Sequence, residues 1–519
     1  MVTKTNSTSM KQAFRNEPLL QFWGITFICA YYYLIAQAVT LDDAFIYFRV
    51  VNNFLHTGKP LFNIGDNYLS VTSPLWTVLL ALGKTVCPFL KLTLIAKLWW
   101  VILLMTASFL AYLAFYPFIG KWAVFICCPF FLSPMISSMI GNEIALLYLA
   151  IFGVLWASVY HKYFMIGFFL GVGYLSRGEV IFIIIPVLFH FILNRKKQHL
   201  SPKQIIFIII KIGLIMTSII LLWHSYYFIT FHSLFPETFE VKMLQGQSGD
   251  WKLFHQAIRM YLEMLLDGRI YLLLFAIIGA LWQPYLFVFM ATYTLCHSIA
   301  YSILKIPYYH WYYYDYYIFV LILILFGLFN MFETLYKLLV KKIEPDKWKI
   351  GGYKATLSFS LFMIIIVNWI FPINFKLFLP QYISNIYQNN NMSSRGISYT
   401  EISKRLLKEL HSDDIILSNE VGIFSYFLEN FEIRDVNGLA SPGVTLANMN
   451  NWAYFVDLYQ PRFLILGGQE ALKVFEFNHH LYVYDRHFTI PQDSTHMEVT
   501  VYIKSTEKTA KNEILQEVK

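Results

Sequence analysis

The sequence predicts an α-helical polytopic membrane protein that ends in a small mixed α/β domain. Of its 519 residues, 57% are hydrophobic and 14% are charged, against roughly 45–50% and 25% in soluble domains. Apolar stretches of about 20 residues, the length of a spanning helix, recur from Leu20 to Ile373, and the chain turns polar after Leu379. These observations exclude a water-soluble globule. They predict a membrane domain over residues 1–379 and a soluble domain over 380–519.

The apolar stretches predict about eleven crossings, and the basic loops at 195–203 and 341–354 are expected in the cytoplasm. The first run is longer than a signal-peptide core, so we expect an uncleaved helix with a cytoplasmic N-terminus. An odd number of crossings then puts the C-terminal domain outside. The segment Pro74–Cys87 would upset this order as a twelfth crossing, so we expect a half-helix at the outer surface. The predicted spans are 20–39, 96–116, 122–141, 143–160, 163–176, 178–194, 205–229, 269–281, 283–305, 316–338 and 355–373.

The C-terminal domain shows both helical and strand-like spacing. Residues 400–410 have the spacing of a helix that starts after Ser398 or Tyr399. Four short runs of β-branched and aromatic residues predict strands at 415–417, 463–466, 481–484 and 499–503. We expect this domain to help hold an acceptor, although a purely structural cap is an alternative.

The unusual polar residues all fall at the predicted outer ends of the helices. They form five segments: Leu41–Phe45, Gly141–Glu143, Ser176–Glu179, Phe235–Thr238 with Lys242, and Tyr308–Asp315. Ionisable groups at membrane depth are costly and tend to line functional cavities. The pattern predicts a site for a polar, carbohydrate-like ligand at the lipid boundary.

Each segment also has a plain structural interpretation. Asp42 and Asp43 could cap the helix that follows them, since acids favour a helix N-terminus. Arg177 and Glu179 could be a structural ion pair, and Lys242 an ordinary solvated lysine. The tyrosine-rich run could be an interfacial aromatic belt. Their gathering on one predicted face favours the functional interpretation.

Several motifs, in order along the chain, resemble those of the GT-C glycosyltransferases. These integral membrane enzymes use polyprenyl-phosphate sugars, and the likeness is strongest to the bacterial branch that includes terminal arabinofuranosyltransferases. The segments that carry it are Asp42–Arg49, Gly58–Asn63, Thr72–Trp76, Gly141–Leu146, Ser176–Glu179, Leu234–Phe239 with Lys242, Asn419–Gly422 and Asp435–Pro442. Gly178 replaces the family's proline, and Lys59 stands where the family has no basic residue. The WWDYG signature of oligosaccharyltransferases is absent from the sequence.

The resemblance implies transfer of a sugar from the lipid-linked donor to an envelope glycan or glycolipid. Asp42, with Asp43 second, would be the general base that deprotonates the acceptor hydroxyl. Direct displacement with one base implies inversion at the anomeric carbon. The other candidates would bind the donor phosphate or a sugar: Arg177, Lys242, His310 and Lys59 as cations, Glu143 and Glu179 as partners of cations or of hydroxyl groups, and Tyr309, Trp311 and Tyr313 as stacking rings.

No cofactor is expected to be required, although Asp42, Asp43 and Glu143 could hold a divalent cation. The implied partners are the donor, the acceptor and membrane lipid, without nucleic acid, and the implied location is a bacterial inner membrane with the site on the periplasmic side. Two rivals stay open: a lipid-sugar flippase or transporter, and a polysaccharide ligase or polymerase. The flippase would show inverted repeats and charges at mid-helix depth, and the sequence displays neither pattern.

Overall fold

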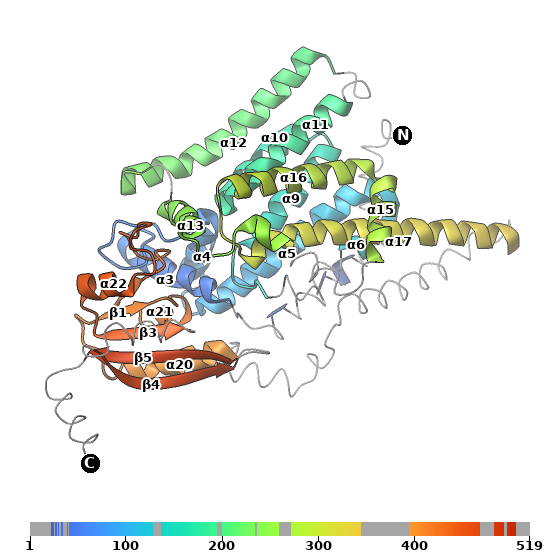
Figure 1. The fold of residues 1–519 in the computed structure, drawn as a ribbon. Helices are drawn as coiled ribbons and strands as arrows, with labels where there is room; N and C mark the ends of the chain where they lie inside the picture. Colours follow the sequence, from blue (N-terminus) through green and yellow to red (C-terminus); the bar gives the residue numbers. More distant parts are fainter. Residues whose placement is uncertain are drawn as a thin grey trace. The chain divides into compact units, whose positions relative to one another are not determined.

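The computed structural model describes residues 41–127, 138–194, 200–233, 236–258, 271–343, 394–467, 482–491 and 496–504. It also describes single residues and short runs at 22–24, 26–27, 30, 33–34, 39 and 136. The chain forms two compact units (Figure 1). The helical unit comprises Met1–Gln37, Lys97–Trp223 and Lys252–Ser384, and the mixed unit comprises Ala38–Ala96, His224–Trp251 and Asn385–Lys519.

The helical unit is built from apolar helices joined by short 3-10 turns. Its elements are α5 (Leu92–Ile119), η2 (Gly120–Trp122), α6 (Ala123–Cys127), α9 (Ile144–Val159), α10 (Tyr163–Ser176), η3 (Gly178–Ile183), α11 (Ile184–Asn194), α12 (Pro202–Phe231), α15 (Leu272–Trp282), α16 (Pro284–Ile303), η4 (His310–Tyr313) and α17 (Tyr314–Ile343). The first five residues of α5 and the last eight of α12 belong to the mixed unit. Among the described residues, four helical stretches are long and apolar enough to cross a membrane: Leu92–Ile119, Pro202–Phe231, Pro284–Ile303 and His310–Leu335. The chain is therefore a multi-pass membrane protein.

Small residues let these helices approach closely. A Cβ atom added at Gly279 on α15 would lie 1.9 Å from the carbonyl oxygen of Leu323 on α17. The converse holds for Gly327 on α17, whose added Cβ would lie 1.9 Å from the carbonyl oxygen of Phe275. Such close backbone approach is typical of helix pairs in membranes, where van der Waals packing replaces the hydrophobic drive.

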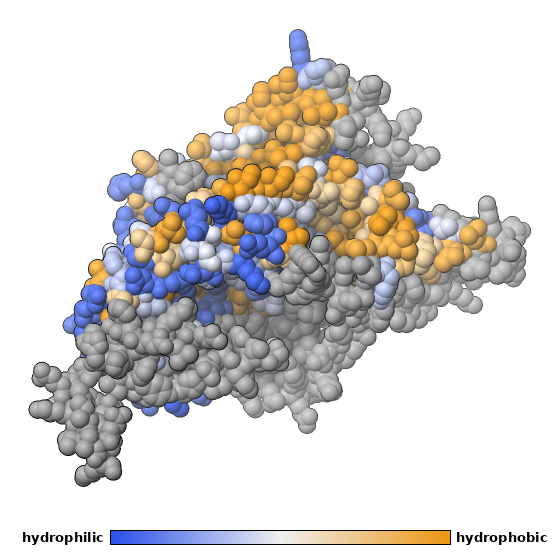
Figure 2. All heavy atoms as spheres, viewed as in Figure 1, coloured by the Kyte–Doolittle hydropathy of each residue, from blue (hydrophilic) through white to orange (hydrophobic). Residues whose placement is uncertain are grey.

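The outer surface of this unit is apolar, as a lipid-facing surface must be. Figure 2 shows hydrophobic residues over the visible faces of α12 and α16. On α12, Phe207, Leu214 and Leu222 are 68%, 64% and 76% exposed. An exposed apolar patch of this extent marks a surface that lipid or another partner covers.

The mixed unit combines early helices with the C-terminal sheet. Its elements are α3 (Asp42–Thr57), α4 (Pro74–Val86), α13 (Glu237–Ser248), α20 (Ser394–Leu406), β1 (Ile415–Ser418), α21 (Ile423–Phe427), β2 (Glu432–Asp435), α22 (Trp452–Tyr459), β3 (Phe463–Gly467), β4 (Tyr482–Pro491) and β5 (His496–Lys504). The strand order is β2-β1-β3-β5-β4, with β1 parallel to β2 and β3 and the remaining pairs antiparallel.

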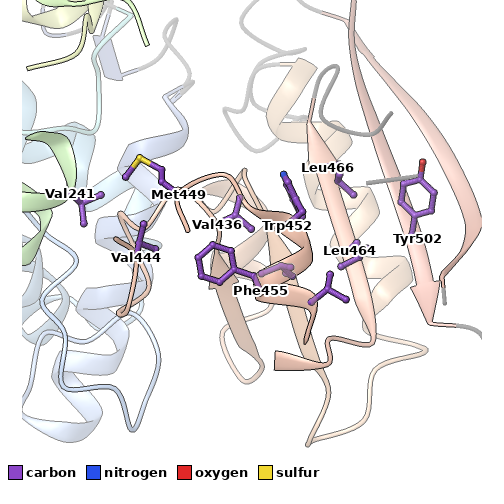
Figure 3. Close-up of a cluster of buried hydrophobic side chains, with 11 residues drawn as sticks. Val241, Val436, Val444, Met449, Trp452, Phe455, Leu464, Leu466 and Tyr502 are labelled. Carbon is purple, nitrogen blue, oxygen red and sulfur yellow. The ribbon is translucent and has the colours of Figure 1, made fainter. Parts of the chain in front are cut away.

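One apolar cluster joins three parts of the sequence inside this unit. Figure 3 shows Val241 of α13 near Val444 and Met449, at one end of a cluster that continues through α22 to the sheet. Trp452 and Phe455 on α22 face Leu464 and Leu466 on β3. The cluster therefore ties α13 to the sheet.

The predicted fold class is confirmed, with several corrections to individual elements. The predicted strands at 415–417, 463–466, 481–484 and 499–503 correspond to β1, β3, β4 and β5, and Pro74–Cys87 contains the helix α4. The helix predicted at 400–410 begins six residues earlier, at Ser394, and ends four residues earlier, at Leu406, because Leu407–Glu409 form turns. The polar segment Phe235–Thr238 with Lys242 runs into a helix, α13, over Glu237–Ser248.

Several predictions fall on residues that the structure does not describe or place. The boundary at 379/380, the span 355–373, the basic loop 195–199 and most of the first span lie outside the described residues. The division into units was not predicted, since residues 38–96 and 224–251 belong with the C-terminal domain. The count of eleven crossings and the placement of all motifs on one membrane face stay predictions.

Candidate functional site

The helical unit contains a buried charged triad of Glu143, Arg177 and Glu179, which we call the arginine triad. Arg177 Nη1 lies 3.1 Å from Glu143 Oε1, and Arg177 Nε donates to Glu179 Oε1. All three residues are 6–7% exposed. The sequence-predicted pair of Arg177 and Glu179 is thus present, and Glu143 joins it from 34 residues upstream.

Local backbone geometry turns these side chains inward. The backbone of Arg177 is extended, with φ −156° and ψ 127°, so the helical path is interrupted between α10 and η3. At the start of α9, the Asn142 side chain accepts the N–H of Ile144 at 3.0 Å, which orders the turn that holds Glu143. The polar motifs at 141–143 and 176–179 therefore meet inside the same unit.

Aromatic residues from the 301–316 segment complete the surroundings of the triad. Tyr301 donates its hydroxyl to Glu179 Oε2 at 3.2 Å, and the Arg177 guanidinium lies over the Tyr312 ring at 5.2 Å. His297 packs edgewise on Tyr301 and pairs with the Tyr316 hydroxyl at 2.9 Å. Tyr301, Tyr312 and His297 were not among the predicted site residues, because nothing in their spacing distinguishes them from other aromatic residues of membrane helices.

The triad carries more acid than base. Two carboxylates face one guanidinium, and Asp315 is buried nearby, where Glu179 and Arg177 act on it electrostatically. The Arg177 guanidinium is held in place from two sides, through Nε by Glu179 and through Nη1 by Glu143.

The three predicted stacking rings occupy different environments. Tyr309 and Trp311 stack on each other, with ring centroids 4.8 Å apart at 19°. Tyr313 is buried and stacks on Phe254 at 4.5 Å and 2°, and its hydroxyl donates to the Phe254 carbonyl. His310 is exposed and lies against Trp311. Tyr313 is 1% exposed, whereas Tyr309 and Trp311 are partly exposed, which makes Tyr309 and Trp311 the better candidates for stacking on a ligand.

The mixed unit holds the predicted acid pair at the start of α3. Asp42 Oδ2 accepts the backbone N–H of Gly422 at 2.9 Å, and Oδ1 accepts that of Ile423 at 2.8 Å. Asp42 and Asp43 both lie in the first turn of α3, where acids favour the helix N-terminus, and the N-cap residue Leu41 has no side-chain cap. The contact of Asp42 with Gly422 joins the Asp42–Arg49 motif to the Asn419–Gly422 motif, about 380 residues away. Asp43 is partly buried.

The remaining predicted cations lie on the surface of the mixed unit. Lys59 is exposed just after α3, and Lys242 is partly exposed on α13. In the same unit, the Asp435–Pro442 motif accepts hydrogen bonds from two side chains outside it. Tyr68 donates to the Gly438 carbonyl at 2.6 Å, and Gln245 of α13 donates to the Asn437 carbonyl at 3.3 Å.

Sequence reasoning did not single out Arg49, a buried side chain of this unit that donates several hydrogen bonds. It is 1% exposed and donates to five acceptors: the Phe62, Ser425, Leu428 and Phe431 carbonyls and Asn63 Oδ1, at 2.7–3.1 Å. Burial lowers the pKa of Arg49 to about 9. Its place in the Asp42–Arg49 motif was the one available signal.

Within the described part of the chain, no three His, Cys, Asp or Glu side chains gather to hold a metal ion. Asp42 and Glu143, two of the three ligands considered for a divalent cation, instead bind backbone N–H groups and Arg177, respectively. The expectation that no cofactor is required stays a prediction.

The geometry defines a multi-pass membrane protein with a buried charged triad and a C-terminal α/β region. No family model and no curated protein matches the chain. Similar solved structures are ArnT from Cupriavidus metallidurans bound to undecaprenyl phosphate (10% identity, TM-score 0.49), the same protein in the apo state (11%, 0.48), and the Archaeoglobus fulgidus oligosaccharyltransferase in complex with Zn and sulfate (12%, 0.46).

The two ArnT matches cover 93% of this chain and 97% of the other, and the oligosaccharyltransferase match covers 85% and 67%. None of the three concerns an arabinofuranosyltransferase. At these identities and TM-scores the likeness carries no argument about residues or substrate.

Proposed function

We propose that the chain is a membrane glycosyltransferase that moves a sugar from a polyprenyl-phosphate donor to a glycan or glycolipid acceptor. The observation that carries this proposal is the arginine triad. It unites the motifs at 141–146 and 176–179 in a buried, charged cluster within a unit of apolar helices. A buried ion pair is weak evidence for stability, whereas ionisable groups among membrane helices are functional by default.

The triad supports a role in binding the donor. Departure of a lipid phosphate leaves negative charge on its oxygens, and a fixed cation stabilises that charge. Glu143 and Glu179 hold the Arg177 guanidinium through Nη1 and Nε, and we propose that the guanidinium donates to a phosphate oxygen. The two carboxylates also fix the orientation of the guanidinium, so binding would cost little reorganisation.

For the base we propose Asp42, the first acid of the Asp42–Arg49 motif. Its carboxylate is held by two backbone N–H groups, which fixes its position while each oxygen keeps a further lone pair. Proton removal from an acceptor hydroxyl by one carboxylate, with direct attack on the anomeric carbon, gives inversion. We propose that this takes place at the outer face of a bacterial inner membrane.

The experiment is sugar transfer from radiolabelled polyprenyl-phosphate donors in membranes that carry the chain, with envelope extract as acceptor. Wild type should transfer label. Asp42→Asn and Arg177→Gln should each lower transfer by about 100-fold or more, in line with the loss of a general base or a charge-stabilising donor. Lys59→Gln, which alters an exposed lysine, tests that candidate in the same assay.

Equal transfer by wild type and Asp42→Asn would contradict the base, and Asp43→Asn then tests the second acid. If wild type transferred no sugar from any donor, the proposal that the chain is a glycosyltransferase would be contradicted. Translocation of a lipid-linked sugar by wild type would then favour the flippase.

A further inference from the structure

The turn Gly422–Ile423 and the helix α3 are joined at two points by complementary polar groups. At one point, both Asp42 carboxylate oxygens accept main-chain N–H groups, from Gly422 and Ile423. At the other, seven residues or about two helical turns further along α3, Arg49 Nη1 donates to the carbonyls of Ser425 and Leu428 at 2.8 and 3.1 Å. An acid thus meets the N–H end of α21, and a guanidinium meets its carbonyl end.

Aromatic packing fills the space between these two points. Phe45 and Phe48 of α3 pack edgewise on the Tyr426 ring, with centroids 5.7 and 5.8 Å away. Arg49 extends the junction further, since Nη2 donates to the Phe431 carbonyl at 2.7 Å. The segment from Gly422 to Phe431 is therefore fixed along the first two turns of α3.

Position 422 has no room for a side chain. A Cβ atom there would lie 2.2 Å from the Cγ, the Oδ2 and the main-chain oxygen of Asp42. The φ angle of Gly422 is −86°, a value that any residue adopts. Glycine is required here for the close approach of Asp42.

We propose that the Gly422–Ile423 turn is a positioning element that orients the Asp42 carboxylate, with Gly422 and Arg49 as the positioning residues. The inference rests on the proposed function, in which Asp42 is the base. The C-terminal region would then contribute to transfer without touching the substrate, through two N–H groups that only a proline substitution removes directly.

The rate measurement uses Gly422→Ala, which displaces the carboxylate and leaves both acids of the pair in the chain. We expect kcat to fall at least tenfold while KM stays within twofold, because a misplaced base slows the chemical step and leaves binding intact. Arg49→Lys should lower kcat in the same way, since a lysine cannot reproduce the five hydrogen bonds.

The matched control is Glu429→Gln, at the exposed edge of the same junction, where Glu429 accepts a hydrogen bond from Asn52 at 2.5 Å. It should keep kcat within twofold. A Gly422→Ala enzyme with unchanged kcat would overturn the proposal. A fall in kcat that merely tracks a lower melting temperature would overturn it equally, because the residue would then be structural only.

A second measurement needs no activity. In hydrogen–deuterium exchange of the full chain in detergent, Asp42→Ala should speed exchange of the peptide that contains Gly422 and Ile423 by about tenfold or more. The peptide over β1 should be unchanged. Unchanged exchange at 422–423 would overturn the contact itself. If wild type transfers no sugar but Asp42→Ala speeds this exchange, the proposed function fails while the Asp42 contact stands.

Discussion

Asp435 illustrates how a single buried carboxylate can organise a loop of the mixed unit. It is 2% exposed, and its oxygens accept the N–H groups of Asn437 and Ala440 at 2.8 and 2.9 Å. Burial raises the pKa of Asp435 to about 6, against the opposing effect of the surrounding backbone N–H groups. The side chain that shapes the Asp435–Pro442 motif is therefore also sensitive to pH.

The shift predicts a pH dependence of stability with a definite sign. The folded pKa lies above the unfolded value of about 3.9, so this group stabilises the fold fully below pH 4. That contribution is lost as pH rises to 6. Two pH units correspond to roughly 3 kcal/mol. On acidification from pH 7 to pH 4, the melting temperature of wild type in detergent should therefore rise relative to that of Asp435→Asn. If the melting temperatures of the two chains changed with pH in the same way, the raised pKa of Asp435 would be contradicted.

At the scale of elements, the helix pair α15–α17 depends on two glycines that face each other. Each lies so close to the opposite backbone that an added methyl group would overlap a carbonyl oxygen. Helices in lipid have little hydrophobic drive to associate, so close backbone packing is what holds such a pair. The sequence shows both glycines but not which helices they join.

We expect Gly327→Ala to destabilise the helical unit by about 1–3 kcal/mol, the usual effect of overpacking. Gly213→Ala on α12 is the matched control, because nothing lies within 4 Å of its added Cβ. That control should be neutral or stabilising by up to about 1 kcal/mol, since alanine favours a helix. Thermal melting in detergent measures both, and equal melting temperatures would argue against tight α15–α17 packing.

At the scale of the whole molecule, the apolar face of α12 predicts contact with lipid. A fluorophore on Leu222→Cys, in a chain whose natural cysteines are replaced, should be quenched by brominated lipids. The same label on Leu458→Cys of α22, a position 54% exposed in the mixed unit, should not be quenched. Equal quenching at the two positions would show that this face of α12 does not differ from α22 in its access to lipid.

The sequence predicted the parts of the molecule that local pattern controls. Apolar length gave the helices, and alternation gave four of the five strands, whereas β2 is only Glu432–Asp435 and too polar to stand out. The pairing of Arg177 with Glu179 followed from a spacing of two residues. Arg49 could not be predicted, because its acceptors Ser425, Leu428 and Phe431 lie more than 370 residues away and are main-chain atoms of any sequence.

The five hydrogen bonds of Arg49 also have a consequence for biosynthesis. The residue that donates to Phe431 is made 382 residues before its acceptor. At 5–20 residues per second, on the order of half a minute passes between the two. During that interval α3 and its buried guanidinium lack three carbonyl partners from the C-terminal region. The nascent chain must carry an unfinished unit until Phe431 has been made, and a product truncated before residue 420 could never complete it.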